Sequence, residues 1–292
     1  MTLRTTSPFS ETQFLGVGIG LRPQHYAEIL AETSTDGIGI DWFEAISENY
    51  MVPGGRPVRM LDAVRSRFPI TLHGVSLNLG SADPLDEPYL ERLAVLAARF
   101  EPAWLTDHLC WTGVDGESVH DLLPLPYTES VVRHVVERIA RVQDRLRRRI
   151  AIENVSSYLA FREDEMPEWE FLSEIAVRAD CGILFDINNV FVSAHNHDFD
   201  AWKYVDSIPC DRVFQIHLAG PSEAGALLID THDSPVREEV WSLYERFLRR
   251  AGPISTLVEW DDSIPPLARV AAEAARARSI LERVASEGEE RR

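Results

Sequence analysis

The feature that most constrains the fold is a repeat: a short apolar run followed by a segment with helical periodicity recurs eight times along 292 residues. The apolar runs have the length of strands, and the segments between them carry apolar residues at amphipathic-helix spacing. The predicted strands cover residues 14–20, 39–47, 70–77, 103–111, 149–155, 182–190, 212–220 and 254–261. The predicted helices open near Pro23 and cover 57–68, 86–100, 128–148, 168–179, 199–205, 236–251 and the residues from 263 onward.

Strands that alternate with helices pair in parallel through right-handed crossovers. Eight such units predict an α/β fold, a closed (β/α)8 TIM barrel, which accommodates a chain of this length. We expect a single domain over residues 1–292, with the barrel at about 14–285 and short flexible termini. An open doubly wound sheet is the alternative, but no glycine-rich GxGxxG turn opens a helix, because Gly16, Gly18 and Gly20 lie within the first predicted strand.

Charge and composition exclude several classes of partner. The formal net charge of −18 disfavours nucleic acids and anionic membranes, which are bound through lysine and arginine. Neither a signal peptide nor an apolar run of about 18 residues is found, so the cytoplasm is the expected location. Cys110, Cys181 and Cys210 lie apart in apolar stretches, which predicts free thiols rather than a disulfide scaffold.

Polar side chains stand at the carboxyl end of nearly every predicted strand. In a barrel these ends meet at one face, so residues that are distant in the sequence converge there. The loop after the seventh predicted strand is expected to return Asp230 and His232 to the same face. The strand-end residues are Glu48, Asn49, His73, Asp107, His108, Glu153, Asn154, Asp186, Asn189, His217, Glu259 and Asp261.

Such a group of imidazoles and carboxylates is costly to bury without a lysine or arginine nearby, and we expect none there. Bound cations remove that cost. Mixed histidine and carboxylate ligands suit iron, manganese or zinc, whereas calcium and magnesium prefer oxygen alone and copper(I) prefers sulfur. The candidate ligands exceed the coordination positions of one ion, so two or three ions are predicted, with Glu153 or Glu259 bridging them.

A single histidine is weaker evidence for a metal site than the placement of several histidines at strand ends. His73 or His217 alone is equally compatible with a hydrogen-bonded core residue. His195 and His197 fall in a predicted loop, AHNHDFD, where a solvated side chain is as compatible as a ligand. Of these two, His197 is the better candidate for contact with a substrate.

Seven motifs in order carry a family resemblance. Together they resemble the multinuclear non-heme iron-dependent oxidative enzymes, which modify cysteines in ribosomally made peptides, including the methanobactin-type copper chelators. The resemblance extends from the first to the eighth predicted strand. The motifs are LHGVSLNLGS (72–81), DHLCW (107–111), IENVSSY (152–158), FDINNVFVSAHNH (185–197), QIHLAG (215–220), IDTHD (229–233) and VEWD (258–261).

The resemblance implies a xylose-isomerase-like TIM barrel with two or three irons, as Fe(II) and Fe(III), at its mouth. His73, His108 and Glu153 are then ligands of one iron, with Glu153 shared. Asp261 is hypothesised to accept a proton and, with His197, completes the predicted catalytic residues. The ligands implied for the other irons are Asp186, Asn189, His217, Asp230, His232 and Glu259.

The resemblance also implies an activity and partners. Family enzymes bind the thiolate of a peptide cysteine to a ferrous ion and use dioxygen for a four-electron oxidation or a carbon excision. A cation lowers the thiol pKa and aligns the reactants. The implied partners are a cysteine-containing precursor peptide and a small protein that captures its leader, often as a heterodimer. Many members have histidine where this chain has Pro221 and Ser234, and glycine where it has Asp198, so substrate recognition can differ.

Two other classes of function remain open. A metal-dependent sugar isomerase or phosphodiesterase can be built on the same barrel, but Lys203 is the only lysine in the chain and a nuclease would want a basic face. A non-enzymatic metal-binding scaffold is the third reading, and the completeness of the ligand set argues against it.

Overall fold

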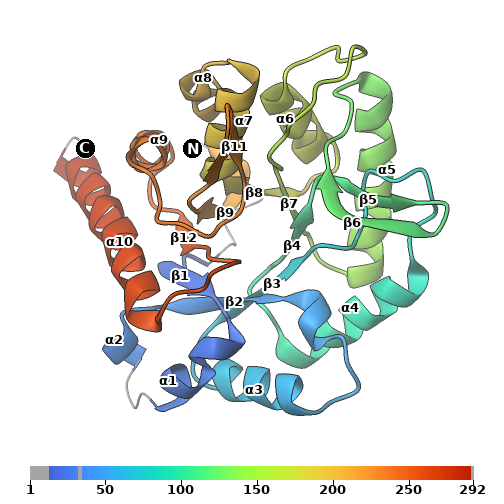
Figure 1. Cartoon of the computed structure of the whole chain (residues 1–292). Helices are drawn as coiled ribbons and strands as arrows, with labels where there is room; N and C mark the ends of the chain where they lie inside the picture. Colours follow the sequence, from blue (N-terminus) through green and yellow to red (C-terminus); the bar gives the residue numbers. More distant parts are fainter. Residues whose placement is uncertain (1–12, 32–34, 291–292) are drawn as a thin grey trace, which may run out of the picture.

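The computed structural model describes residues 13–31 and 35–290, so the predicted flexible termini lie largely outside the described residues. Eight parallel strands close into a barrel in the order β1-β12-β9-β8-β7-β4-β3-β2, with helices around it (Figure 1). The closed barrel predicted from the eight repeats is confirmed, and the open sheet is excluded. The strands are β1 (Val17–Gly20), β2 (Trp42–Ile46), β3 (Ile70–Gly74), β4 (Leu105–His108), β7 (Ala151–Glu153), β8 (Gly182–Asp186), β9 (Val213–Leu218) and β12 (Ser255–Val258).

The long helices lie close to their predicted bounds and pack their apolar stripes on the barrel. In α5, for example, Val132, Val135, Ile139 and Val142 are buried at helical spacing. No helix among the described residues combines the length and the apolar character needed to cross a membrane. The long helices are α3 (Arg56–Arg65), α4 (Glu87–Phe100), α5 (Glu129–Leu146), α6 (Glu168–Arg178), α9 (Glu238–Ala251) and α10 (Leu267–Glu290). The short ones are η1 (Pro23–His25), α1 (Tyr26–Ala31), α2 (Thr35–Ile38), η2 (Ser47–Tyr50), α8 (Ala201–Ser207) and η3 (Cys210–Arg212).

The prediction was wrong after β8. We expected a strand to residue 190 and then a polar loop, but α7 (Ile187–His197) begins directly at the end of the strand. The Asp186 carboxylate accepts a hydrogen bond from the backbone N–H of Asn189 at 2.6 Å and caps this helix. The apolar run FDINNVFV fits a buried strand as well as a buried helix, so periodicity could not separate the two.

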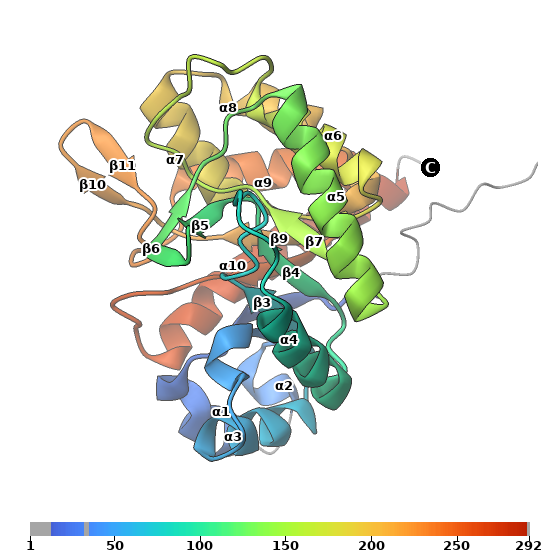
Figure 2. The same ribbon diagram turned by 90° about the vertical axis from the view of Figure 1, so that its right-hand side faces the viewer.

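Two hairpins stand where the sequence indicated loops or strand ends. One is formed by β5 (Trp111–Val114) and β6 (Glu117–Leu123), and the other by β10 (Ser222–Ala224) and β11 (Leu227–Ile229). They follow the carboxyl ends of β4 and β9, and Figure 2 shows the β10–β11 hairpin projecting from the body of the barrel. Both hairpins therefore belong to the rim where the predicted site lies.

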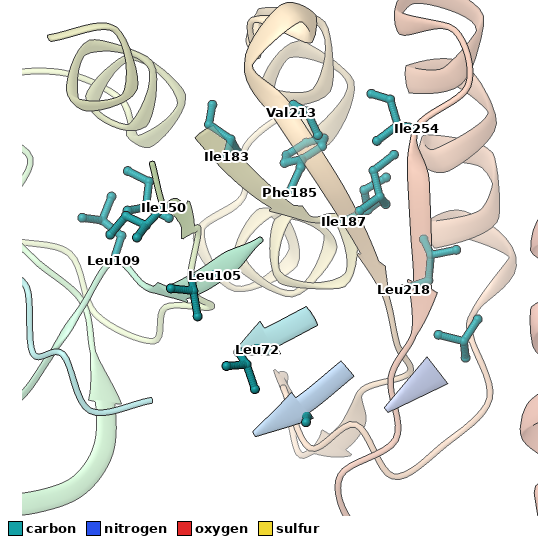
Figure 3. Close-up of a cluster of buried hydrophobic side chains, with 14 of the residues drawn as sticks. Leu72, Leu105, Leu109, Ile150, Ile183, Phe185, Ile187, Val213, Leu218 and Ile254 are labelled. Atoms are coloured by element: carbon teal, nitrogen blue, oxygen red, sulfur yellow. The ribbon is translucent and has the colours of Figure 1, made fainter. Parts of the chain in front are cut away.

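Apolar and polar side chains alternate along the barrel strands, so the outer surface of the barrel is apolar and much of its interior is polar. Figure 3 shows Ile183, Phe185 and Val213 among the buried apolar side chains between strands and helices. Phe185 packs against Phe247 of α9, with ring centroids 4.9 Å apart. Because successive side chains of a strand point to opposite faces, the neighbouring residue Asp186 is directed into the barrel.

The amino end of the barrel is closed by aromatic rings, and this closure requires a glycine. The rings of Trp42 and Trp104 meet edge to face at 6.0 Å. A Cβ atom on Gly18 of β1 would lie 2.5 Å from the Trp42 ring, so only glycine leaves room for it.

We therefore expect Gly18→Ala to lower the free energy of unfolding by about 1–3 kcal/mol through overpacking. Urea unfolding measures the effect. Gly288→Ala is the matched control, because no atom lies within 4 Å of the added Cβ in α10. That variant is expected to be neutral or more stable by about 0.5–1 kcal/mol. Equal stability changes in the two variants would contradict the steric argument.

Candidate metal centre

A polar layer lies above the tryptophans and supports the site. Gln215 accepts a hydrogen bond from the Trp104 indole N–H at 2.6 Å and donates one to Glu44 Oε2 at 2.7 Å. Thr71 Oγ1 donates to the same carboxylate oxygen at 3.0 Å. Glu44, a buried residue of β2, was not among the predicted site residues. Its carboxylate has its hydrogen-bond partners within the barrel and is fixed beneath the histidines.

The first group of candidate ligands comes from β3, β4 and β7. His73 Nε2 and His108 Nε2 lie 3.2 and 3.3 Å from the same oxygen, Glu153 Oε2. On the other side of the rings, His73 Nδ1 contacts Thr106 Oγ1 at 2.7 Å, and His108 Nδ1 donates to the Gly74 carbonyl at 3.0 Å. A backbone carbonyl on one ring nitrogen fixes the tautomer and leaves the other nitrogen as a ligand.

The charge states of this group favour a bound cation. Burial lowers the pKa of His73 and of His108, so both imidazoles are neutral at pH 7. Glu153 Oε2 has no hydrogen-bond partner among the described residues. A lone pair on each imidazole therefore faces an unpartnered carboxylate oxygen, an arrangement that a metal ion would satisfy.

The second group surrounds His217 of β9. Its Nε2 lies 2.8 Å from Glu44 Oε1, while its Nδ1 lies 3.0 Å from Glu259 Oε2 and 3.4 Å from Glu153 Oε1. Burial lowers the pKa of His217, but the negative charges of Glu44, Glu259 and Glu153 outweigh it and raise the pKa well above its ordinary value. The cluster thus attracts positive charge strongly. The two Glu153 oxygens face two different histidine groups, which is the placement of a bridging carboxylate.

The third group lies between the loop after β11 and the end of β12. His232 Nε2 is 2.7 Å from Asp230 Oδ1, and its Nδ1 is 3.3 Å from Glu259 Oε2 and 3.2 Å from Asp261 Oδ2. Burial lowers the pKa of His232, but the neighbouring carboxylates, first Asp230, raise it well above its ordinary value. Glu259 is therefore shared between this group and the His217 group.

Asp186 and Asn189 add two further oxygens. Asp186 Oδ2 and Asn189 Oδ1 have no hydrogen-bond partner among the described residues, although both side chains are buried. The Asn189 amide nitrogen donates to the Asn154 carbonyl at 2.9 Å, which leaves its oxygen free for a ligand role. Asp186, His232 and Glu259 offer atoms within 4.8 Å of one another, as do Glu153, Asp186 and His217.

The nine predicted metal ligands are thus brought together at the carboxyl face of the barrel. A cleft of about 190 Å³ opens onto the site. His197 does not line it: its Nε2 contacts Ser157 Oγ at 2.8 Å, and it borders a neighbouring pocket. Asp261 does line the cleft and has a side chain 43% exposed. The other predicted residues that line the cleft are His73, His108, Glu153, Asn189, Asp230, His232 and Glu259.

The expectation that no arginine lies nearby was wrong. The guanidinium of Arg22, two residues after β1, forms an ion pair with Asp261 and lies 3.5 Å from Glu259 Oε1. A Cβ atom on Gly20 would lie 3.1 Å from Arg22 Nε, so this glycine leaves room for the side chain. Extending the strand-end search by two residues would have found Arg22. The single positive charge of Arg22 does not neutralise the negative charges of the surrounding carboxylates. These carboxylates are Glu44, Glu153, Asp186, Asp230, Glu259 and Asp261.

The donor set fits metal ions of a particular kind. It combines imidazole nitrogens with carboxylate and amide oxygens, and the groups of side chains placed to hold an ion contain no cysteine among the described residues. Such a set suits iron, manganese or zinc. Two carboxylates, Glu153 and Glu259, are each shared between two groups, so the three groups adjoin one another.

Comparisons with known proteins agree with this architecture. The UPF0276 protein of Anaeromyxobacter sp. (strain Fw109-5) is 56% identical over 268 residues, covering 92% of this chain and 93% of that protein. In fold alone, the chain resembles endonuclease IV from Thermus thermophilus, with a TM-score of 0.59, 17% identity, and 92% and 99% of the two chains covered.

A xylose isomerase-like TIM barrel protein from Mycobacterium smegmatis, in complex with magnesium, has a TM-score of 0.56 and 10% identity, with 90% and 88% of the two chains covered. The predicted xylose-isomerase-like barrel is thus confirmed. Residues 16–282 match the family described as RiPP precursor modification enzyme MbnB/TglH/ChrH. This match spans the whole barrel and every candidate ligand, and the chain therefore belongs to that family.

Proposed function

We propose that the protein is a multinuclear iron-dependent oxidase that uses dioxygen to modify cysteine residues of a ribosomally synthesised precursor peptide. The observation that carries the proposal is the position of Glu153, whose two oxygens face two separate histidine groups. Family membership supports the peptide substrate. We propose iron rather than manganese or zinc because the seven sequence motifs resemble those of iron-dependent enzymes.

The proposed roles follow the three groups. His73, His108 and Glu153 hold one ion, and His217 with Glu153 and Glu259 holds the next. Bound iron would supply a Lewis acid for the cysteine sulfur and electrons for dioxygen. The ligands proposed for the remaining positions are Asp186, Asn189, Asp230 and His232.

Asp261 is proposed to accept the proton released by the cysteine thiol. Its carboxylate lines the cleft at the solvent side, where a substrate would enter. The ion pair with Arg22 holds the carboxylate at this position. Arg22 is therefore a positioning residue for the proposed proton acceptor.

Two of the three departures from the family pattern, Pro221 and Ser234, lie side by side. Ser234 Oγ donates a hydrogen bond to the Pro221 carbonyl at 3.0 Å, which links the two loops that follow β9 and β11. Neither residue belongs to the three ligand groups. We propose that this pair changes how the rim receives a substrate and leaves metal binding unaffected.

A sugar isomerase or phosphodiesterase is the less favoured alternative. The only lysine, Lys203, lies over the Trp169 ring at 5.1 Å and does not line the cleft. Arg22 forms ion pairs with Asp261 and Glu259, so its guanidinium offers little free positive charge to a phosphate group. The likeness to endonuclease IV concerns the fold.

A precursor peptide and a leader-capturing protein are the proposed partners. The chain has 47 acidic and 29 basic residues, so its charge would suit a basic leader and disfavours nucleic acid. The leader could also dock by adding a strand to a sheet edge. Because precursor peptides are made by ribosomes, we propose that the reaction takes place in the cytoplasm.

The proposal is tested by co-expressing the protein with a cysteine-containing precursor peptide encoded beside its gene and with the partner protein. We expect the protein to be purified with iron and the peptide to have a mass that differs from the encoded one. Fragmentation should locate the change to a cysteine. A precursor with cysteine replaced by serine is the control, and an unchanged mass under aerobic, iron-replete conditions would contradict the proposal.

A further inference from the structure

Residues 155–161 form a wall between two cavities. This segment begins the long connection between β7 and α6 (Figure 1). Ser156 and Tyr158 line the metal cleft, whereas Ser157 and Leu159 line a second pocket. Neighbouring residues of this segment thus line different cavities, so the two cavities share the segment as a wall.

The second pocket is large and mostly apolar. Its volume is about 330 Å³, which exceeds the roughly 150 Å³ of a cavity that holds benzene. Trp169 and Phe199 meet in the wall with ring centroids 5.9 Å apart. The size and the lining suit a bulky apolar side chain. The apolar lining residues are Leu125, Tyr127, Leu159, Phe161, Met166, Trp169 and Phe199.

The polar groups of the pocket are already engaged or uncharged. The Asp164 carboxylate accepts hydrogen bonds from the backbone N–H groups of Tyr127 at 2.8 Å and Phe161 at 3.2 Å. The Glu168 residue is partly exposed, but its carboxyl group is enclosed beside Tyr127 and Tyr204, and burial raises its pKa to about 8. At pH 7 this carboxyl group is therefore mainly protonated. The Asp164 carboxylate is thus held by backbone N–H groups, and the lining contains no lysine or arginine for an anionic ligand.

We propose that this pocket binds the apolar side chain of a substrate residue close to the modified cysteine. The inference rests on the proposed function and adds a determinant of peptide sequence. A chain whose cysteine lies in the cleft has to cross only this one segment to enter the pocket, and three extended residues reach about 10 Å. The occupant is therefore an aromatic or branched aliphatic residue within about three positions of the cysteine.

This assignment keeps the predicted contact of His197 with the substrate and replaces its predicted catalytic role. Its imidazole borders the apolar pocket and contacts Ser157 Oγ and the Ser157 carbonyl, at 2.8 and 3.1 Å. The contact fixes the middle of the wall segment from the pocket side. His197 thus shapes the substrate pocket and does not reach the reacting atoms in the cleft.

The methionine methyl groups allow a direct test. The chain has four methionines, and Met166 lines the proposed pocket while Met51 lines a groove between α3 and α4. The full chain is labelled with ¹³C at the methionine methyls and loaded with Zn²⁺ under argon, so that no oxidation occurs. Met166→Leu assigns the Met166 signal.

The probes are glycine heptapeptides with a central cysteine and one phenylalanine at each of the other positions in turn. We expect the Met166 signal to shift with phenylalanine at one or two positions, and the Met51 signal to stay in place. Replacing that phenylalanine by aspartate should raise the half-saturating peptide concentration at least about tenfold, because a buried apolar side chain contributes about 1.5–3 kcal/mol.

Matched variants separate the pocket from the rest of the surface. Leu159 and Leu227 have exposed fractions of 48% and 41%, and only Leu159 lines the pocket. Leu159→Asp should raise the half-saturating concentration of the phenylalanine peptide about tenfold, and Leu227→Asp should leave it unchanged. Ala160→Trp, which adds a ring at the pocket, is a second variant with the same expected effect.

The inference is overturned if no phenylalanine peptide shifts the Met166 signal, or if the aspartate peptides shift it equally. It is also overturned if the Met51 signal moves in parallel, or if Met166 responds to protein concentration alone, which would indicate a second copy of the chain. A position-dependent Met166 shift, together with an unmodified cysteine in the aerobic, iron-replete co-expression experiment, would retain the pocket and reject the proposed function. Oxidation without a Met166 shift would do the reverse.

Discussion

Glu153→Gln is expected to leave the barrel folded and to remove most of the bound metal. The amide has nearly the same shape as the carboxylate, and its NH2 group can donate to the lone pairs of His73 Nε2 and His108 Nε2, which lie 3.2 and 3.3 Å from Glu153 Oε2. The negative charge and the bridging oxygens are lost. Metal affinity should fall at least about 100-fold, because loss of even an outer-shell partner costs 10–100-fold. Elemental analysis of the purified variant measures the loss.

Glu48→Gln provides the control for this variant. Glu48 also follows a barrel strand, but its Oε1 accepts hydrogen bonds from the Val75 N–H at 2.9 Å and the Tyr89 hydroxyl at 2.7 Å. It does not line the cleft. We expect Glu48→Gln to keep its metal. Parent-level metal in Glu153→Gln, or equal losses in both variants, would show that the ions are held elsewhere.

The barrel could be predicted because its signal is repeated and local. Helices such as α5 carry buried valines at regular spacing, and caps such as Thr128 mark where they begin. The prediction failed after β8, where the sequence fits the periodicity of a buried strand as well as that of a buried helix. Residues 187–190 are buried almost throughout, so neither face of an amphipathic pattern is visible in the sequence. At this point the N-cap residue Asp186, whose side chain accepts a hydrogen bond from the Asn189 N–H, favours the helix.

The candidate site could be predicted as far as strand ends define it. Barrel closure brings His73, Glu153 and His217 together although the sequence separates them widely, and the strand-end rule needs only that closure. Glu44 was missed because it lies in mid-strand, one layer below the rim. Its role becomes visible only through the side chains of other strands that surround it.

His217→Ala is expected to destabilise the metal-free protein by about 3–5 kcal/mol, the usual cost of leaving buried charges without their partner. The imidazole lies within 3.4 Å of the carboxylates of Glu44, Glu153 and Glu259, and its pKa is raised well above the ordinary value because their charges outweigh the effect of burial. This stabilisation is fully present below the unfolded pKa of about 6.5 and is lost as the pH rises through the folded pKa.

His73→Ala is the matched comparison, because it removes another buried imidazole from the same cluster of candidate ligands. Burial lowers the pKa of His73, so the side chain is neutral and its loss creates a cavity without stranding a charge. Urea unfolding in the presence of a chelator should therefore show a clearly larger loss for His217→Ala. Adding Glu44→Gln to His217→Ala should recover part of that loss, since Glu44 Oε1 lies 2.8 Å from the missing Nε2. Equal losses in the two single variants, or no recovery in the double variant, would mean that electrostatic compensation does not hold the metal-free site together.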